Sequence, residues 1–336
     1  MSDSAPIDDT GPTASLEMLR LRSRVLRQIR NLFDDHGYWE VQTPLLSIDT
    51  CVDAWIDPYA LPGTGPLGET CYLQTSPEFA MKRLVAHGAD AIYEITRSFR
   101  RGEAGIRHNP EFTMVEWYRA GDDHIAQMAF TESLVRSVAS LSQDRSRTLP
   151  EQPFLRLTYD DAFERAIGVR VLERPTADLI QLARRLDVPA PGSLAAEDRD
   201  GWLNLLLALR VEPFLPSLGP LFLHDFPASQ AALARVRNDS PPVAERFELY
   251  VDGLELCNGY HELTDPEELR ERMERQSAMR VAAGKESLPA MSRLVRTLQR
   301  GFPPSAGVAL GFERLLMWLV GTDRIADVTA FPFARA

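Results

Sequence analysis

Apolar and polar residues alternate at helical spacing near the start of the chain and predict an amphipathic helix over residues 15–36. Ser15 is suited to cap its first turn, and Gly37 is suited to end it. The apolar positions that share one face are Leu21, Val25, Ile29 and Phe33. Residues 38–42 are then expected to form a strand.

Further along, residues 91–99 and 111–118 read as two strands flanking a loop rich in charge and glycine. Residues 244–262 mix β-prone and acidic residues with a glycine turn, which favours a strand–turn–strand unit. The predicted helices in the rest of the chain are residues 124–142, the highly charged residues 266–284, and residues 312–319 after a short strand at 308–310.

Strands separated by long insertions, without regular βαβ alternation, predict the α+β class, with an antiparallel sheet flanked by helices. Residues 150–225 carry several helical patterns and two Pro/Gly-rich breaks, so we expect a helical insertion between catalytic strands. Residues 1–14 are polar and acidic and are predicted to be a disordered tail. The remaining residues, 15–336, are expected to form one catalytic domain.

Composition limits the classes of protein. The 336 residues are 44% hydrophobic and 25% charged, which is ordinary for a soluble globular protein. No apolar run is long enough for a transmembrane helix, and no signal peptide is evident, so we expect no membrane association.

Cys51, Cys71 and Cys257 lack CxxC spacing and the six histidines lack HExxH spacing. Neither a disulfide framework nor a zinc site is therefore expected, and a reducing cytoplasm fits. The net charge of −11 disfavours an extended nucleic-acid surface.

The chemistry concentrates in residues 98–114. Arg100 follows an apolar strand, where a guanidinium can bind a phosphate bidentately, although a surface ion pair is the alternative. Phe112 alone would be a core residue, but on the returning strand it is a candidate platform for a nucleotide base. His108 and Asn109 are turn-compatible polar residues between them.

Carboxylates form a second candidate group. Glu248, Glu255 and Glu262 recur every seven residues in the predicted strand–turn–strand unit. Such groups beside a triphosphate hold Mg²⁺, or they bind a substrate ammonium; a solvated charged edge is the structural alternative. Ser76 and Glu78 open a predicted helix as N-cap and first-turn acid, which explains them structurally, while functionally Glu78 could face an ammonium.

These segments match known motifs. The matching strings are Gln74–Glu78, Ser98–Arg100, Arg107–Met114, Glu116–Tyr118, Glu255–Gly259, His261–Asp265 and Gly307–Arg314. In this order they resemble the catalytic domain of class II lysyl-tRNA synthetases. Among these, the chain is most similar to the free-standing paralogues, the elongation factor P–(R)-β-lysine ligases.

The resemblance implies an ATP site. It assigns Arg100 to the α-phosphate and to charge stabilisation during adenylation, and it stacks Phe112 on adenine with Arg314 over the other face. Arg100 and Arg314 would be the catalytic residues. The family's glutamate two positions after the motif arginine is replaced here by Gly102, with Glu103 one position later. The remaining nucleotide residues would be Glu103, His108, Asn109, Glu255, Leu256 and Gly311, with Glu248 and Glu255 holding Mg²⁺.

The resemblance also implies a lysine site. Ser76 and Glu78 would meet the amino and carboxylate end of the substrate, and Tyr118 and Glu262 its distal ammonium. Ala309 stands where lysyl-tRNA synthetases usually carry glycine and where the ligases carry alanine.

The implied function is ATP-dependent activation of (R)-β-lysine or lysine and its ligation to a lysine of elongation factor P. No room is left for an anticodon-binding OB domain before residue 15, so tRNA is not the expected partner. A minimal enzyme charging tRNA or a tRNA-like RNA, and an inactive paralogue that only binds a partner, remain alternatives. Class II enzymes dimerise through the first motif, here Leu16–Pro44, which implies a homodimer.

Overall fold

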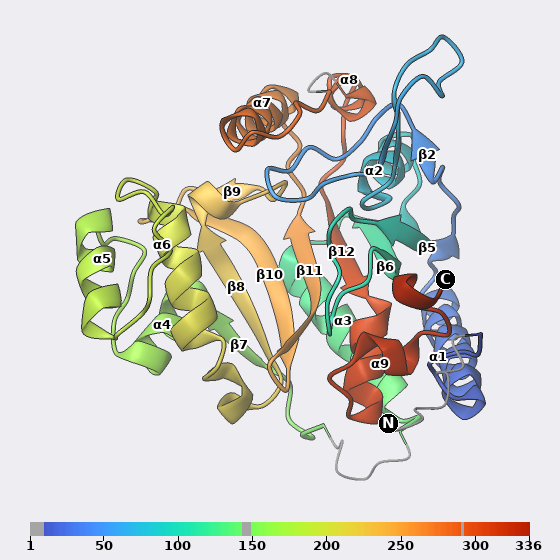
Figure 1. The fold of residues 1–336 in the computed structure, drawn as a ribbon, viewed down its shortest axis with the longest axis horizontal. Helices are drawn as coiled ribbons and strands as arrows, with labels where there is room; N and C mark the ends of the chain where they lie inside the picture. Colours follow the sequence, from blue (N-terminus) through green and yellow to red (C-terminus); the bar gives the residue numbers. More distant parts are fainter. Residues whose placement is uncertain (1–9, 143–148, 290–291) are drawn as a thin grey trace, which may run out of the picture.

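A twisted nine-stranded sheet forms the centre of the protein in a computed structural model, which describes residues 10–142, 149–289 and 292–336 (Figure 1). The strand order is β1-β5-β6-β12-β11-β10-β8-β7, and β9 pairs with β10. The strands are β1 (Trp39–Glu40), β5 (Ala91–Phe99), β6 (Glu111–Ala120), β7 (Leu155–Thr158), β8 (Leu221–Pro227), β9 (Val236–Arg237), β10 (Val243–Val251), β11 (Leu254–His261) and β12 (Ser305–Gly311).

Antiparallel pairing runs through the middle of this sheet, from β5 to β8. Parallel pairing occurs only at the two ends, between β1 and β5 and between β7 and β8. A small second sheet joins β2 (Leu46–Ser47), β4 (Cys71–Leu73) and β3 (Ala60–Leu61). The predicted α+β class with an antiparallel sheet is confirmed.

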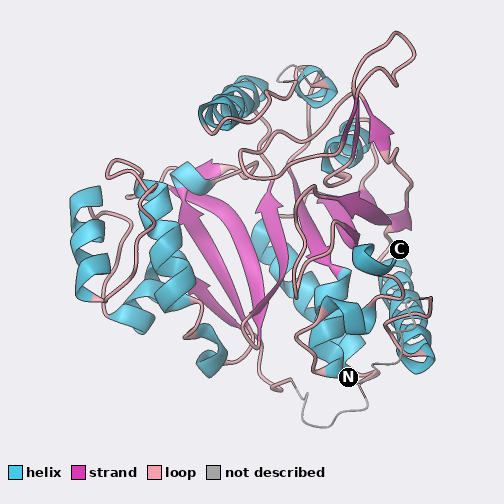
Figure 2. Ribbon diagram, in the orientation of Figure 1, coloured by secondary structure: helices cyan, strands magenta, loops and turns pink. Residues whose placement is uncertain are grey.

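Helices flank the sheet (Figure 2). They are α1 (Leu16–Asp35), α2 (Glu78–Ala86), α3 (His124–Ala139), α4 (Tyr159–Ile167), α5 (Thr176–Arg185), α6 (Arg199–Leu206), α7 (Pro266–Ala282), α8 (Arg293–Leu298) and α9 (Phe312–Val320). The largest core cluster joins α1, α3 and α9 to the sheet, with Phe33, Trp117 and Phe312 fully buried. Within the described residues, no helix combines the length and the hydropathy needed to cross a membrane.

The first helix forms as its sequence pattern predicts. Val25, Ile29 and Phe33 are buried, and the Ser15 hydroxyl accepts a hydrogen bond from the Met18 N–H at 3.1 Å. The chain leaves the helix through Gly37 at φ +75°, a left-handed conformation that glycine adopts without strain.

The predicted disordered tail is wrong at its C-terminal end. Residues 1–9 lie outside the described residues, but Ala14 is buried against the core. The backbone N–H groups of Thr13 and Ala14 donate to the carbonyls of Ala330 and Thr329. The chain is therefore fixed against its own C-terminal segment before α1 begins.

The segment predicted as a helical insertion also contributes to the sheet. Its helices α4, α5 and α6 lie at one side of the molecule, as expected (Figure 1). In addition, β7 and β8 bracket the segment and add two strands to the main sheet. The sequence pattern did not predict these strands. For β8, the reason is that the strand is buried on both faces and lacks the polar alternation of a half-exposed strand.

The helix start predicted at Ser76 is displaced. The helix begins at Glu78, and Pro77 occupies the cap position without a side-chain cap bond. The Ser76 hydroxyl accepts from the Glu78 N–H at 3.1 Å and donates to Glu116. The strand–turn–strand prediction is correct, since β10 and β11 turn through Asp252 and Gly253 at φ +50° and +74°.

Candidate active site

One cavity of about 990 Å³ holds every predicted site residue. Strand alternation explains how residues from distant motifs reach it. Phe112, Met114, Glu116 and Tyr118 occupy alternate positions of β6, and all four line the cavity. The other predicted residues in the lining are Ser76, Glu78, Arg100, Glu103, His108, Asn109, Glu248, Glu255, Leu256, Glu262, Ala309, Gly311 and Arg314.

Arg100 and Phe112 form one wall of the cavity. The guanidinium carbon lies 5.1 Å from the Phe112 ring centroid, and Glu103 lies 3.8 Å from a guanidinium nitrogen. The Arg100 Nε is buried and has no hydrogen-bond partner among the described residues. A buried, unsatisfied guanidinium N–H is a vacant donor, which suits an anionic ligand such as a phosphate.

Arg314 lines the same cavity and forms a network with His108 and Glu255. It donates to the Glu255 backbone carbonyl at 3.0 Å, pairs with the Glu255 carboxylate at 3.2 Å, and contacts His108 Nε2 at 2.9 Å. Burial and the Arg314 charge lower the pKa of His108, which keeps its ring neutral. The neutral ring can then accept from Arg314 through Nε2.

Asn109 lines the cavity but uses its amide structurally. Its Nδ2 donates to the Glu111 carbonyl at 2.5 Å, and its Oδ1 accepts from the Phe333 N–H at 2.9 Å. These bonds tie the motif loop to the C-terminal segment.

Two carboxylates approach each other beside this arginine network. Glu248 accepts from Arg246 at 2.5 Å and from Tyr250 at 2.8 Å. Burial raises the pKa of Glu248 to about 6, with Arg246 opposing the shift and Glu255 adding to it. The nearby Glu255 carboxylate disfavours ionisation of the buried Glu248, and a bound cation would relieve this repulsion, so Glu248 and Glu255 fit the oxygen-ligand chemistry of Mg²⁺.

At the other end of the cavity, two lining carboxylates flank a buried lysine that lies behind the lining. Lys82 Nζ lies 2.6 Å from Glu78 and 2.5 Å from Glu262. Burial alone would lower the pKa of Lys82, but the charges of Glu262 and Glu78 outweigh it and raise the pKa. Burial also raises the pKa of Glu262 to about 7, although Lys82 opposes that shift.

Glu116 completes this end. It accepts from Ser76 at 2.7 Å and from the Tyr118 hydroxyl at 2.6 Å, and burial together with the Glu78 charge raises its pKa to about 8. A Cβ at Gly307 would lie only 2.2 Å from the Tyr118 ring and 2.9 Å from Glu262, so glycine is required between them.

Sequence reasoning did not assign Glu116 and Lys82 to the site. The spacing contained a signal for Glu116, which follows Phe112 and precedes Tyr118 at the same period of two. Lys82 follows Glu78 at the helical i,i+4 spacing, which indicates a pair on one face.

A model of the tRNA synthetases class II (D, K and N) matches residues 9–335. The chain belongs to this family.

Three relatives extend the match. An elongation factor P–(R)-β-lysine ligase of Vibrio cholerae is 42% identical over 98% of this chain and 99% of the relative. Proteins of the same name are 41% identical in Edwardsiella ictaluri, over the full length of both chains, and 40% identical in Salmonella arizonae, over 97% and 98%. The resemblance stated from the motifs is confirmed.

Proposed function

We propose that the protein activates (R)-β-lysine, or lysine, with ATP and joins it to a lysine side chain of elongation factor P. One observation carries the proposal: a cavity with the vacant guanidinium donor of Arg100 at one end and buried carboxylates at the other. The first end suits the phosphates of a nucleotide, and the second suits the ammonium groups of a diamino acid. The names of the relatives support (R)-β-lysine and elongation factor P as the substrates.

In the first proposed step, a substrate carboxylate oxygen attacks the α-phosphorus of ATP, and pyrophosphate leaves as the P–O bond breaks. Arg100 stabilises the charge that develops on the α-phosphate, while Phe112 and Arg314 fix the base and the phosphates. Glu248 and Glu255 would hold Mg²⁺, which neutralises phosphate charge when bound. Because no protein nucleophile is needed, positioning and electrostatics supply the catalysis.

In the second step, the amine of an acceptor lysine attacks the carbonyl carbon of the adenylate, AMP leaves, and the amine gives up a proton. Glu78, Glu116 and Glu262 hold the ammonium groups of the activated substrate during this transfer. The resulting bond is an amide. A tRNA acceptor would offer a ribose hydroxyl and give an ester instead.

The test is a transfer assay with labelled lysine isomers, ATP and Mg²⁺, offering elongation factor P and bulk tRNA side by side. We expect label on elongation factor P in a bond stable to mild alkali. An alkali-labile product on tRNA would overturn the proposal in favour of a minimal synthetase. Failure to form an adenylate with any lysine isomer would favour the inactive, partner-binding alternative.

We also propose a cytoplasmic homodimer. The segment that forms the dimer contact in class II enzymes carries exposed apolar side chains here, with Leu16 65% and Trp39 50% exposed, followed by Leu45 and Leu46. Burial of these side chains against a partner subunit would remove their apolar surface from water. Analytical ultracentrifugation should give twice the mass of one chain, and Trp39→Glu should shift the protein toward monomer.

A further inference from the structure

A second polar cluster lies outside the cavity, where α3, β8, β10 and β11 meet. It contains three of the chain's six histidines: His124, His224 and His261. Asp225 and Glu245 accompany them. The cavity lining includes none of these five residues. Glu245 and His261 alternate along their strands with Arg246 and Glu262, which line the cavity, so the cluster lies on the opposite face of the sheet.

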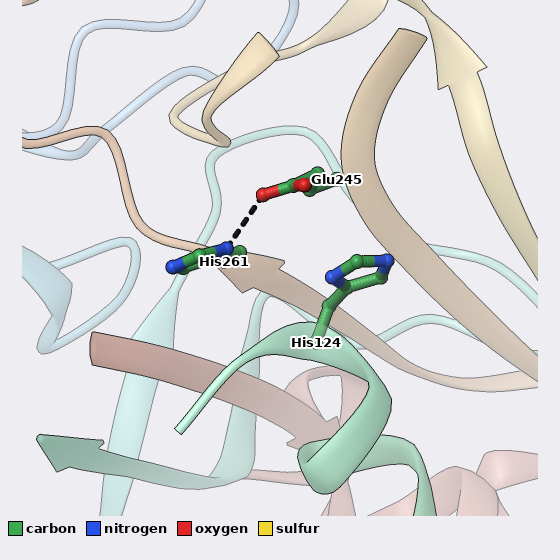
Figure 3. A group of neighbouring side chains, drawn as sticks. All are labelled: His124, Glu245 and His261. Atoms are coloured by element: carbon green, nitrogen blue, oxygen red, sulfur yellow. Dashed lines mark hydrogen bonds and ion pairs between the residues drawn. The ribbon is translucent and has the colours of Figure 1, made fainter. Parts of the chain in front are cut away.

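His124, Glu245 and His261 bring possible ligand atoms together. One such atom from each residue lies within 4.8 Å of those of the other two. His261 Nδ1 lies 2.5 Å from Glu245 Oε2, and a ring nitrogen of His124 faces this pair (Figure 3). Metal–ligand bonds of about 2.0–2.2 Å need only small side-chain shifts from this arrangement.

The His124 side chain lacks the partners that a buried polar group normally has. It is 4% exposed, and its Nδ1 has no hydrogen-bond partner among the described residues. Its Nε2 lies on the side of Asp225, 3.8 Å from Oδ1. An imidazole ligates a metal through a nitrogen that carries no proton, and the unpartnered Nδ1 can serve as such a ligand atom.

Arg237 orients both carboxylates from outside the cluster. It binds Asp225 Oδ2 at 2.9 Å and approaches Glu245 Oε1 at 3.4 Å. These contacts leave Asp225 Oδ1 and Glu245 Oε2 directed toward the histidines. Asp225 Oδ1 is itself buried and lies 3.4 Å from His224 Nδ1.

We propose that His124, Glu245 and His261 form a binding site for one divalent transition-metal ion, with Zn²⁺ as the best fit. Two imidazoles and one carboxylate are ligands that Zn²⁺ accepts, and water would fill the fourth position. Asp225 orients His124 from the outer shell, as carboxylates do for metal-bound histidines. The metal takes the place of the proton between His261 and Glu245, and that ring then carries its proton on Nε2.

A purely structural hydrogen-bond network explains the cluster less well. Such networks in protein interiors satisfy their buried polar atoms. His224 Nδ1 and Asp225 Oδ1 lie 3.4 Å from each other, but the buried His124 Nδ1 has no hydrogen-bond partner among the described residues. A bound cation gives this nitrogen a partner and attracts the carboxylates and imidazoles around it. The bound metal ion would fix α3 to the strands that carry Glu248 and Glu262 on their other face.

The test uses the full-length protein after chelator treatment, with Mg²⁺ in saturating amounts to occupy oxygen-ligand sites. Co²⁺ serves as the spectroscopic probe, followed by displacement with Zn²⁺. We expect one Co²⁺ per chain and a melting temperature raised by about 5 °C at a hundredfold excess of Zn²⁺ over its Kd. X-ray absorption of the Zn²⁺-loaded protein should show two imidazole ligands.

Variants separate this site from the catalytic carboxylates. His124→Gln should weaken Co²⁺ binding by more than the roughly 10–100-fold expected for Asp225→Asn, which removes only an outer-shell partner. His36→Gln is the matched control, because His36 is exposed and its Nδ1 contacts a carbonyl of its own helix. An all-oxygen coordination shell, absence of stoichiometric binding, or binding lost only in Glu248→Gln would overturn the proposal. The absorption measurement needs no variant and decides the matter even if His124→Gln fails to fold.

Discussion

The two ends of the catalytic cavity are built on different principles. At the end proposed to bind the lysine substrate, Glu116 and Glu262 are 1% exposed, and the carboxylates there are held by hydrogen bonds and by Lys82. At the end proposed to bind the nucleotide, the Arg314 and Glu255 side chains are 28% and 37% exposed. The buried end therefore fixes charge in place before substrate arrives, whereas the open end can rearrange around a ligand.

This contrast indicates where selectivity and rate reside. Buried polar groups that match a substrate reject analogues strongly, because a mismatched analogue leaves them unpaired. The family's shared nucleotide chemistry needs donors that strengthen their contacts only in the transition state. Substitutions at the two ends should consequently differ in kind, with rate effects at the arginines and binding effects at the carboxylates.

The largest effect is expected for Arg100→Ala, which removes the vacant donor beside Phe112. Pyrophosphate exchange dependent on a lysine isomer should fall by about 100–1,000-fold, mainly in kcat. Arg97→Ala is the control, since Arg97 lies on β5, which ends just before Arg100, but it is outside the cavity lining and pairs with the exposed Glu111. A loss confined to KM for ATP would assign Arg100 to binding alone.

Ala309→Gly addresses selectivity between isomers. Ala309 lies in register with Glu116 on one neighbouring strand and with Asn258 on the other, and it lines the cavity. Removing its methyl should shift the activation ratio toward α-lysine by about 10–200-fold, the range for one methylene-sized change. Ala306→Gly, on the same strand but outside the lining, should leave the ratio unchanged. If the activation ratio of the two isomers does not change in Ala309→Gly, Ala309 contributes only to packing.

Glu262→Gln keeps the shape of the side chain but removes its charge. The expected loss is about 1.5–3 kcal/mol of substrate binding, seen as a higher KM for the lysine isomer with little change in kcat. Glu94→Gln is a matched control, because Glu94 is also buried in the sheet but does not line the cavity. Equal effects in the two variants would show that Glu262 contributes only to folding.

The sequence predicted the cavity well because its residues lie in short motifs on regular strands. Arg100 and Phe112 belong to one hairpin, and period-two spacing brings Phe112 and Tyr118 to the same face. Lys82 was not assigned because its partner Glu262 is far away in the chain, and only the fold joins them.

For the same reason, the sequence predicted neither the proposed metal site nor the added strands. His124, Glu245 and His261 come from three separate elements, so no spacing rule for metal ligands applies to them. β7 pairs with β8 across the whole insertion, and a four-residue strand carries little periodic signal of its own. Long-range pairing, rather than local propensity, decided these features.

The smallest effect is expected from pH, and it should appear at one end only. Burial raises the pKa of Glu262 to about 7 and of Glu116 to about 8, above the values of such carboxyls in an unfolded chain. Ionising these two carboxyls opposes folding. The free energy of unfolding of the substrate-free protein should therefore fall as pH rises from the ordinary carboxyl pKa of 4.5 to about 8. A bound substrate ammonium favours the ionised carboxylates, whereas the substrate-free protein favours the protonated carboxyls. The KM for the lysine isomer should therefore fall by about tenfold from about pH 6 to pH 8.

Glu116→Gln should flatten this dependence, because it removes one of the two titrating carboxyls. The KM for ATP is the internal control above about pH 7, where His108, with its lowered pKa, is neutral and Glu248, with a pKa of about 6, is ionised. Parallel pH profiles for the two substrates would contradict the difference between the ends. A profile steep for the lysine isomer and flat for ATP would mean that the buried carboxylates titrate as substrate binds, while the arginine network does not.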